Sequence, residues 1–182
     1  ESQINYQGGV ALPYRYNQTE NGFDIDLDYL AKSISAKTKV LILNNYQNPM
    51  SASSSKEELK ALSKLVLKHD LWVLSDDAYY EIRYSQDSPN SILNFPGMKQ
   101  RTVILYTFSK KYAMTGWGIG ASIGPEFLIK HMARFNINDE SCTNHFIQHA
   151  LASMLNDSND YGEEIIKKLI KRRDLCLKKL NS

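Results

Sequence analysis

The stretch TVILYTFSK, residues 102–110, begins with a run of apolar and β-branched side chains and turns polar at Ser109 and Lys110. A short apolar run of this kind predicts a buried strand. Two similar runs precede it, at residues 39–43 and 71–74, and each is also followed by polar residues. Because helical patterns separate these runs, the sequence predicts an α/β fold in which helical layers cover a sheet.

Helices are predicted wherever apolar residues recur at helical spacing. The predicted helices cover residues 26–34, 55–69, 126–135, 144–155 and 162–180. The second begins with Ser55 and Glu58, which have the spacing of a capping box. Residues 121–123 predict a fourth strand, and the turn-rich residues 1–22 predict a strand or a loop that leads into the sheet.

The composition of the chain excludes several classes of protein. Its 182 residues are 42% apolar, which is enough for a core and argues against disorder. Since 22 basic residues nearly balance 20 acidic ones, the net charge of +2 provides no strong field for nucleic acid or an anionic membrane. No apolar run approaches the roughly 20 residues that a spanning helix needs. We therefore expect neither nucleic acid nor a membrane among the partners.

The chain length and the cysteines suggest the context of the protein. A length of 182 residues suits one domain, but the chain starts at Glu1 rather than Met, which indicates a piece of something longer. Cys142 and Cys176 lie far apart and have no CxxC partner, so they are predicted to be half-buried free thiols. Free thiols favour a reducing compartment, and we therefore expect a cytoplasmic protein.

Reactive side chains follow three predicted strands: Asn48 after the first, Asp76 and Tyr79 after the second, and Ser109 with Lys110 after the third. Ligands bind at this edge of open α/β sheets, so these groups are expected to converge. A lysine held out of bulk water beside a carboxylate and a phenol can act as a nucleophile on a carbonyl. A carboxylate facing a pyridine nitrogen keeps it protonated, as pyridoxal phosphate requires. Each residue alone also fits a surface, turn or capping role, so this hypothesis depends on their joint pattern.

Three segments at these strand ends resemble the signatures of class I and II aminotransferases in the pyridoxal phosphate fold-type I superfamily. Residues 44–49, NNYQNP, resemble the family's Asn-x-Pro-x-Asn-Pro loop, with Tyr46 in place of a proline. Residues 75–79, SDDAY, resemble its Asp-x-x-Tyr segment, and residues 107–117, TFSKKYAMTGW, resemble its Ser-x-Ser-Lys-x-x-x-Met-x-Gly signature. Residues 21–30 also resemble the stretch before the Asn-Pro strand, and the resemblance runs over nearly all 182 residues.

The resemblance implies a fold and an extent for the chain. The fold would be a three-layer α/β sandwich with a mostly parallel sheet, and residues 1–182 would form an incomplete cofactor-binding large domain. The family's N-terminal glycine-rich phosphate loop would be absent, as would the C-terminal small domain that binds the substrate carboxylate. We therefore expect this chain to be incapable of efficient transamination on its own.

The resemblance also implies an activity. Lys110 would form an internal aldimine with pyridoxal 5'-phosphate and move the substrate α-proton, while Asp76 would pair with the pyridine nitrogen. The parent enzyme would transfer an amino group from an amino acid to a 2-oxo acid, and these are the implied substrates. A homodimer is implied because a second subunit usually completes the sites of this family.

Five further residues are implied to hold the cofactor. Asn48 and Tyr79 would hydrogen-bond the ring hydroxyl oxygen, and Ala78 would pack against one face of the ring. Ser109 would bind the phosphate, together with Thr107 in place of the family's first serine.

Gly118 departs from the family pattern. The signature usually continues Gly-x-Arg-x-Gly, and Gly118 occupies the place of the arginine, eight residues after Lys110. That arginine clamps the phosphate, and the loss of such a contact would cost about 1.5–3 kcal/mol of cofactor binding. Three alternatives stay open: weak cofactor binding, replacement by another cation, or a catalytically degenerate or truncated module that folds but does not transaminate.

Competing functions lack the motifs that they require. An apolar strand ending in Asp76 and Asp77 resembles a Walker B strand, but no Gly-x-x-x-x-Gly-Lys-[Ser/Thr] loop is present. The glycines of residues 116–120 do not match the dinucleotide-binding fingerprint. His145 and His149 could share a helical face, but without a third ligand they predict a structural helix, and no metal site is predicted.

Overall fold

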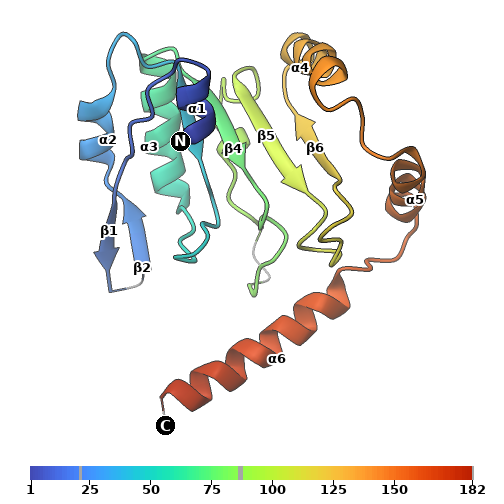
Figure 1. The fold of residues 1–182 in the computed structure, drawn as a ribbon. Helices are drawn as coiled ribbons and strands as arrows, with labels where there is room; N and C mark the ends of the chain where they lie inside the picture. Colours follow the sequence, from blue (N-terminus) through green and yellow to red (C-terminus); the bar gives the residue numbers. More distant parts are fainter. Residues whose placement is uncertain (21, 86–87, 182) are drawn as a thin grey trace.

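The structure, a computed structural model, describes residues 1–20, 22–85 and 88–181. Its central sheet has the order β3-β4-β5-β6, in which β3, β4 and β5 are parallel and β6 is antiparallel to β5 (Figure 1). The strands are β3 (Val40–Leu43), β4 (Trp72–Asp76), β5 (Thr102–Thr107) and β6 (Gly120–Ile123). The predicted mostly parallel α/β sheet is confirmed, and so is the fourth strand.

The register of the sheet brings the strand ends together at one edge. Leu43, the last residue of β3, pairs with Ser75 of β4, and Asp76 pairs with Leu105 of β5. The three polar turns that follow these strands therefore leave from the same edge, as expected for parallel strands.

One face of the sheet is covered by α2 (Leu27–Ser33) and α3 (Lys56–Lys68). The main core lies at this face, and its buried strand and helix residues include Leu41, Leu43, Leu59, Leu62, Val66 and Val73. The prediction that a cap at Ser55 begins a helix is confirmed, because the Ser55 hydroxyl accepts a hydrogen bond from the Glu58 amide at 3.1 Å. The Glu58 carboxylate does not complete a capping box, since it accepts from the Ile25 amide instead, at 2.5 Å.

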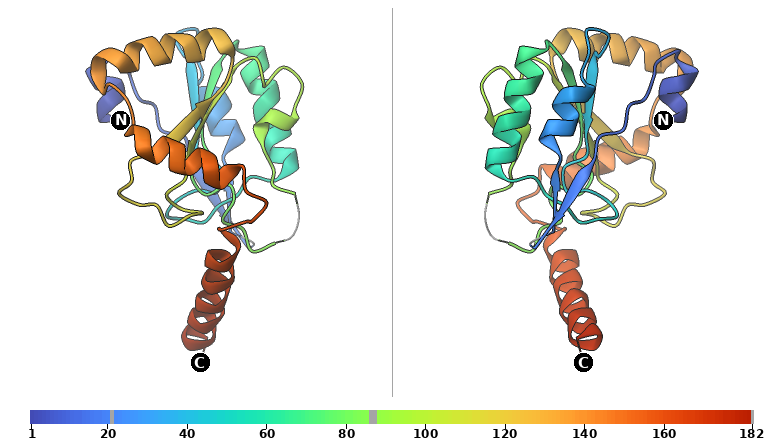
Figure 2. Two further views of the ribbon diagram at one scale, coloured as in Figure 1. Left: turned by 90° about the vertical axis from the view of Figure 1, so that its right-hand side faces the viewer. Right: turned by 90° about the vertical axis from the view of Figure 1, so that its left-hand side faces the viewer.

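The other face of the sheet carries α4 (Glu126–Asp139) and α5 (His145–Leu155), which gives the predicted three layers (Figure 2). Phe127 of α4 packs edge-on against Trp72 of β4, and Ile147 and Leu151 of α5 lie in a smaller cluster with Phe108. The face is incompletely covered beside β3, where Val40 and Ile42 stay exposed.

The N-terminal residues are more structured than predicted. They form a short helix, α1 (Ser2–Tyr6), and an antiparallel hairpin of β1 (Tyr16–Thr19) and β2 (Gly22–Ile25). Asn21, at the start of the stretch that resembles the family, lies outside the described residues. A 3-10 helix, η1 (Ile92–Asn94), follows in the long segment between β4 and β5.

The last helix, α6 (Glu163–Leu180), matches its predicted range and extends away from the sheet (Figures 1 and 2). Cys142 and Cys176 are free, as predicted, but both are exposed rather than half-buried. Across the part of the chain that the structure describes, no helix has the length and apolarity needed to cross a membrane.

Candidate active site

A pocket of about 830 Å³ opens at the carboxyl edge of the sheet. It is bounded by the turn after β3, the segment after β4, the turn after β5 and the first turns of α6. Four of the seven cofactor-site residues predicted from the sequence line it: Asn48, Tyr79, Ser109 and Lys110. The structure therefore brings together side chains that lie more than 60 positions apart in the sequence.

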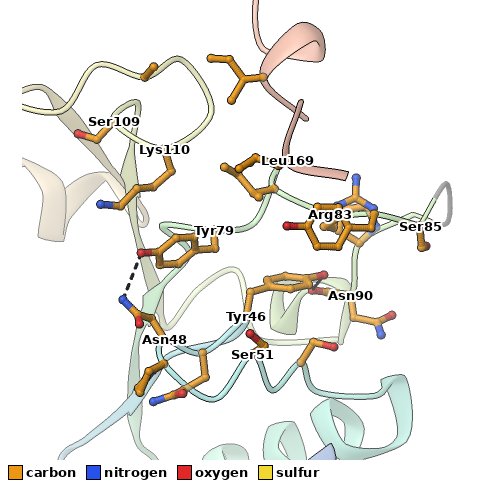
Figure 3. Close-up of a pocket in the computed structure, with 18 of the residues that line it drawn as sticks. Tyr46, Asn48, Ser51, Tyr79, Arg83, Ser85, Asn90, Ser109, Lys110 and Leu169 are labelled. Carbon is orange, nitrogen blue, oxygen red and sulfur yellow. Dashed lines mark hydrogen bonds between the residues drawn. The ribbon is translucent and has the colours of Figure 1, made fainter. Parts of the chain in front are cut away.

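Lys110 is the lysine that lines this pocket, within the described residues. Its side chain is half-buried and extends toward the part of the pocket where Asn48 and Tyr79 meet (Figure 3). The Nζ atom lies 5.7 Å from the centre of the Tyr79 ring. The salt bridges among the described residues do not include Lys110. The Lys110 amine therefore lies in the pocket without an ion-pair partner among the described carboxylates.

Asn48 and Tyr79 form a hydrogen-bonded pair on the opposite wall. The Asn48 side-chain amide donates to the Tyr79 hydroxyl at 3.2 Å (Figure 3). The turn that carries Asn48 is held by Asn44, whose side-chain Oδ1 accepts a hydrogen bond from the Asn48 backbone amide at 3.3 Å. The Asn44 amide in turn donates to the backbone carbonyl of Asp76 at 3.3 Å, so the two turns are linked directly.

The other three predicted residues lie at the same edge but do not line the pocket. Asp76 is half-buried at the end of β4, and its Oδ1 accepts a hydrogen bond from the Ala78 amide at 3.2 Å. Thr107 ends β5, where its Oγ1 lies 3.0 Å from the Oγ of Ser109 and accepts from the Ser109 amide at 3.3 Å. The two hydroxyls and the amide form a small polar cluster beside Lys110.

A second carboxylate, that of Asp77, follows Asp76 and is buried. Asp77 is only 6% exposed, and the Ser75 hydroxyl donates a hydrogen bond to its Oδ1 at 2.8 Å. Burial raises the pKa of Asp77 and Asp76 adds to this, although the Ser75 hydrogen bond opposes them. Asp76 is therefore the one of the two carboxylates that stands at the accessible edge.

Sequence reasoning missed the far wall of the pocket, which includes Tyr46, Arg83 and Asn90. The Tyr46 hydroxyl donates to the Asn90 carbonyl at 3.5 Å, and its ring meets that of Tyr80 edge-on. Burial raises the pKa of the Tyr46 phenol. Tyr46 belongs to the NNYQNP motif, but Arg83 and Asn90 belong to no local motif. Their place in the pocket could not be predicted, because the segment after β4 folds back so that Asn90 meets a turn more than 40 positions earlier.

The metal-binding alternative gains no support from the structure. His145 and His149 lie on one face of α5 with ring centres 4.5 Å apart. Among the described residues there is no group of three or more His, Cys, Asp or Glu side chains placed to hold a metal ion.

The family model for aminotransferase class I and II matches residues 1–182, the whole chain. This chain belongs to the class I and II aminotransferases. The family match and the strand-end pocket agree, because the three resembling segments form the walls around Lys110.

Several relatives support this family assignment. The aromatic-amino-acid aminotransferase 2 of Thermococcus litoralis is 37% identical over 164 residues, which cover 89% of this chain and 42% of that protein. The aspartate aminotransferase of Pyrococcus abyssi has the same identity and coverage. The solved structure of N-succinyldiaminopimelate aminotransferase from Mycobacterium tuberculosis matches with a TM-score of 0.91 at 25% identity, over 98% of this chain and 46% of that one. The aminotransferase chain therefore spans less than half the length of these relatives.

Gly118, at the position of the family's phosphate-binding arginine, lies in an open turn. Its φ is +63°, and no heavy atom lies within 4 Å of where a Cβ would stand. The cationic side chains that line the pocket are those of Lys110 and Arg83, within the described residues. The Arg83 Nε donates to the Tyr80 carbonyl at 3.0 Å, so this guanidinium is tied to the segment after β4.

Proposed function

We propose that this chain is the cofactor-binding part of an enzyme that transfers an amino group from an amino acid to a 2-oxo acid, with pyridoxal 5'-phosphate as cofactor. The observation that carries the proposal is the pocket at the strand ends. In it the half-buried Lys110 amine, outside every salt bridge of the described residues, faces the Asn48–Tyr79 pair.

The donor set of the pocket fits the chemistry of this cofactor. When bound, pyridoxal phosphate supplies an aldehyde that combines with amines and a protonated ring that accepts electrons. Lys110 would hold the aldehyde carbon through Nζ and, once the substrate amine has displaced it, would carry the α-proton. A lysine suits both tasks because it is a nucleophile and a base when deprotonated.

Asp76 would hold the proton on the pyridine nitrogen. The hydrogen bond from the Ala78 amide fixes its carboxylate, and the Asn44 amide fixes its backbone carbonyl, so the group is oriented before a ligand arrives. Asn48 and Tyr79 would bind the ring hydroxyl oxygen, since one offers an amide N–H and the other a phenol. Ala78 would pack against one face of the ring.

Thr107 and Ser109 would bind the phosphate. Their hydroxyls are 3.0 Å apart, and both can donate to phosphate oxygens at the end of β5. Residues 1–182 would form an incomplete large domain, and segments outside this range would complete the site. The whole enzyme would be a cytoplasmic homodimer.

A second candidate function is a module that folds without transaminating. One observation favours it: the uncharged Gly118 stands at the position of the family's arginine. In this alternative Lys110 would keep its place in the pocket, but the affinity for pyridoxal phosphate would be low.

A labelling experiment tests the proposed role of Lys110. The purified chain is mixed with pyridoxal phosphate, examined for a visible absorption band, reduced with borohydride and mapped by peptide mass spectrometry. We expect one adduct, on Lys110, which is absent from a Lys110→Ala variant and retained in a matched Lys111→Ala variant. An absent adduct in the wild-type chain would favour the non-catalytic module, and a band that persists in Lys110→Ala would show that the lysine is misassigned.

A turnover assay tests the incomplete-domain hypothesis. Aspartate and an aromatic amino acid, the donors suggested by the names of two relatives, are supplied with a 2-oxo acid. We expect little or no product from the isolated chain, whereas rapid turnover would contradict its description as an incomplete large domain.

A further inference from the structure

Two adjacent lysines enter the turn after β5, and their ammonium groups have opposite surroundings. Lys110 lines the strand-end pocket and belongs to no salt bridge of the described residues. The Lys111 side chain is 13% exposed and pairs with two carboxylates, Glu81 Oε1 at 3.0 Å and Asp160 Oδ2 at 3.4 Å. The signature of residues 107–117 assigns the pocket amine to Lys110, and the structure shows what surrounds the neighbouring Lys111 amine.

Glu81 is the better fixed of the two carboxylates that face Lys111. Its Oε2 accepts a hydrogen bond from the Tyr106 hydroxyl on β5, while its Oε1 faces Lys111. Glu81 is 33% exposed, whereas Asp160 is 53% exposed. Burial alone would lower the pKa of Lys111, but the hydrogen bond and charge of Glu81 outweigh it, and the pKa is raised.

The stem of Lys111 is also confined. A Cβ at Gly162 would lie 2.5 Å from the Lys111 Cγ, so the absence of a side chain there makes room for the stem. On another side, the Lys111 Nζ lies 5.2 Å from the centre of the Tyr112 ring. The ion pair with Glu81 and the space beside Gly162 together hold the Lys111 side chain away from the pocket that Lys110 lines.

We infer that Glu81 is a positioning residue that selects between the two lysines: it holds the Lys111 amine in an ion pair outside the pocket and leaves Lys110 as the amine of the pocket. A protonated amine has no lone pair with which to attack a carbonyl. Glu81 thus acts through Lys111 and the turn rather than on the cofactor, and the inference rests on the proposed role of Lys110.

The test measures the reactivity of each lysine without the cofactor. Trace acetic anhydride acylates deprotonated amines: the nitrogen bonds to the acyl carbon, acetate leaves and the proton goes to solvent. Acetylation of Lys110 and Lys111 is mapped by mass spectrometry and normalised to the exposed Lys37. In the wild-type chain we expect Lys111 to react more slowly than Lys110. In Glu81→Gln we expect Lys111 labelling to rise about fivefold, the factor that ~1 kcal/mol corresponds to.

Two further variants change the surroundings of Lys111 without touching Glu81. Asp160→Asn is the matched control, since it removes the more exposed and more distant carboxylate, and should raise Lys111 labelling less than Glu81→Gln does. Gly162→Ala keeps every charge but displaces the Lys111 stem, and should raise Lys111 labelling even if Glu81→Gln does not fold. Unchanged Lys111 labelling in a folded Glu81→Gln or Gly162→Ala chain would overturn the inference.

A second readout uses pyridoxal phosphate and borohydride. We expect the adduct on Lys110 alone in the wild-type chain and on both lysines in Glu81→Gln. A wild-type chain without any adduct would count against the proposed function, while the acetylation pattern would still decide the role of Glu81.

Discussion

The side-chain amide of Asn48 donates a hydrogen bond to the hydroxyl of Tyr79 at 3.2 Å, across 31 positions of sequence. The bond joins the turn after β3 to the segment after β4, and it exists because Leu43 and Ser75 are in register in the parallel sheet. Both groups therefore reach the pocket from fixed backbone positions. A ligand oxygen that binds between them would meet donors that are already oriented, which lowers the entropic cost of binding.

Removal of the Tyr79 hydroxyl should weaken cofactor binding. We expect Tyr79→Phe to raise the Kd for pyridoxal phosphate about tenfold, the factor for the loss of one hydrogen bond worth ~1.4 kcal/mol. Tyr80→Phe is the matched control, because Tyr80 is adjacent but does not line the pocket. Titration of the visible absorption band measures both values, and equal Kd values for the two variants would contradict the proposed role of Tyr79.

Much of this fold could be predicted because its determinants are local. The strands at β3, β4 and β5 are short apolar runs, and the start of α3 is encoded by Ser55, whose hydroxyl caps the Glu58 amide. The partner of the Glu58 carboxylate could not be predicted, since the Ile25 amide comes from a hairpin 33 positions away. The same limit applies to the hairpin of β1 and β2, since the sequence predicted a strand or a loop for residues 1–22 but not the pairing of two strands.

The site divides in the same way. The convergence of Asn48, Tyr79 and Lys110 could be predicted because parallel strands end at one edge of a sheet. The Glu81–Lys111 pair could not, because Glu81 belongs to no motif, Lys111 occupies a variable position of its signature, and their contact depends on how two turns pack. Tertiary contacts between irregular segments leave no periodic pattern in the sequence.

An arginine at position 118 should strengthen phosphate binding. The space around Gly118 is open, but its φ of +63° makes any side chain cost about 1 kcal/mol there. Gly118→Ala introduces the same backbone strain but adds no charge, so the affinity of Gly118→Arg is compared with that of Gly118→Ala. Relative to it, we expect Gly118→Arg to lower the Kd for pyridoxal phosphate about 10- to 100-fold, as one charge-assisted hydrogen bond would. Equal affinities would mean that position 118 does not face the phosphate.

The Glu58 carboxylate should stabilise the fold by tying the hairpin to α3. Glu58→Ala would leave the buried Ile25 amide without its acceptor, and we expect the free energy of unfolding to fall by about 1–3 kcal/mol. Glu58→Gln keeps an acceptor oxygen at the same place and should lose less. Urea unfolding followed by circular dichroism measures both, and similar losses in the two variants would argue against a hydrogen-bonding role.

The buried Asp77 should make stability depend on pH in an unusual direction for a carboxylate. Its folded pKa is raised by burial, so the folded chain binds the proton more tightly than the unfolded chain does. The stability that Asp77 contributes is therefore present at low pH and is lost as the pH rises from the unfolded value of 3.8 through the raised folded pKa. Asp77→Asn cannot titrate and still offers an oxygen to the Ser75 hydroxyl at the same position.

We expect the difference in unfolding free energy between Asp77→Asn and the wild-type chain to shift in favour of the variant as the pH rises through this window. Urea melts at a series of pH values measure it, and other carboxylates cancel because both chains contain them. Ser75→Ala sharpens the test: the Ser75 hydrogen bond lowers the pKa of Asp77, so its removal should extend the window upward. A difference that stays constant with pH would show that the proton affinity of Asp77 is the same in the folded and unfolded chains.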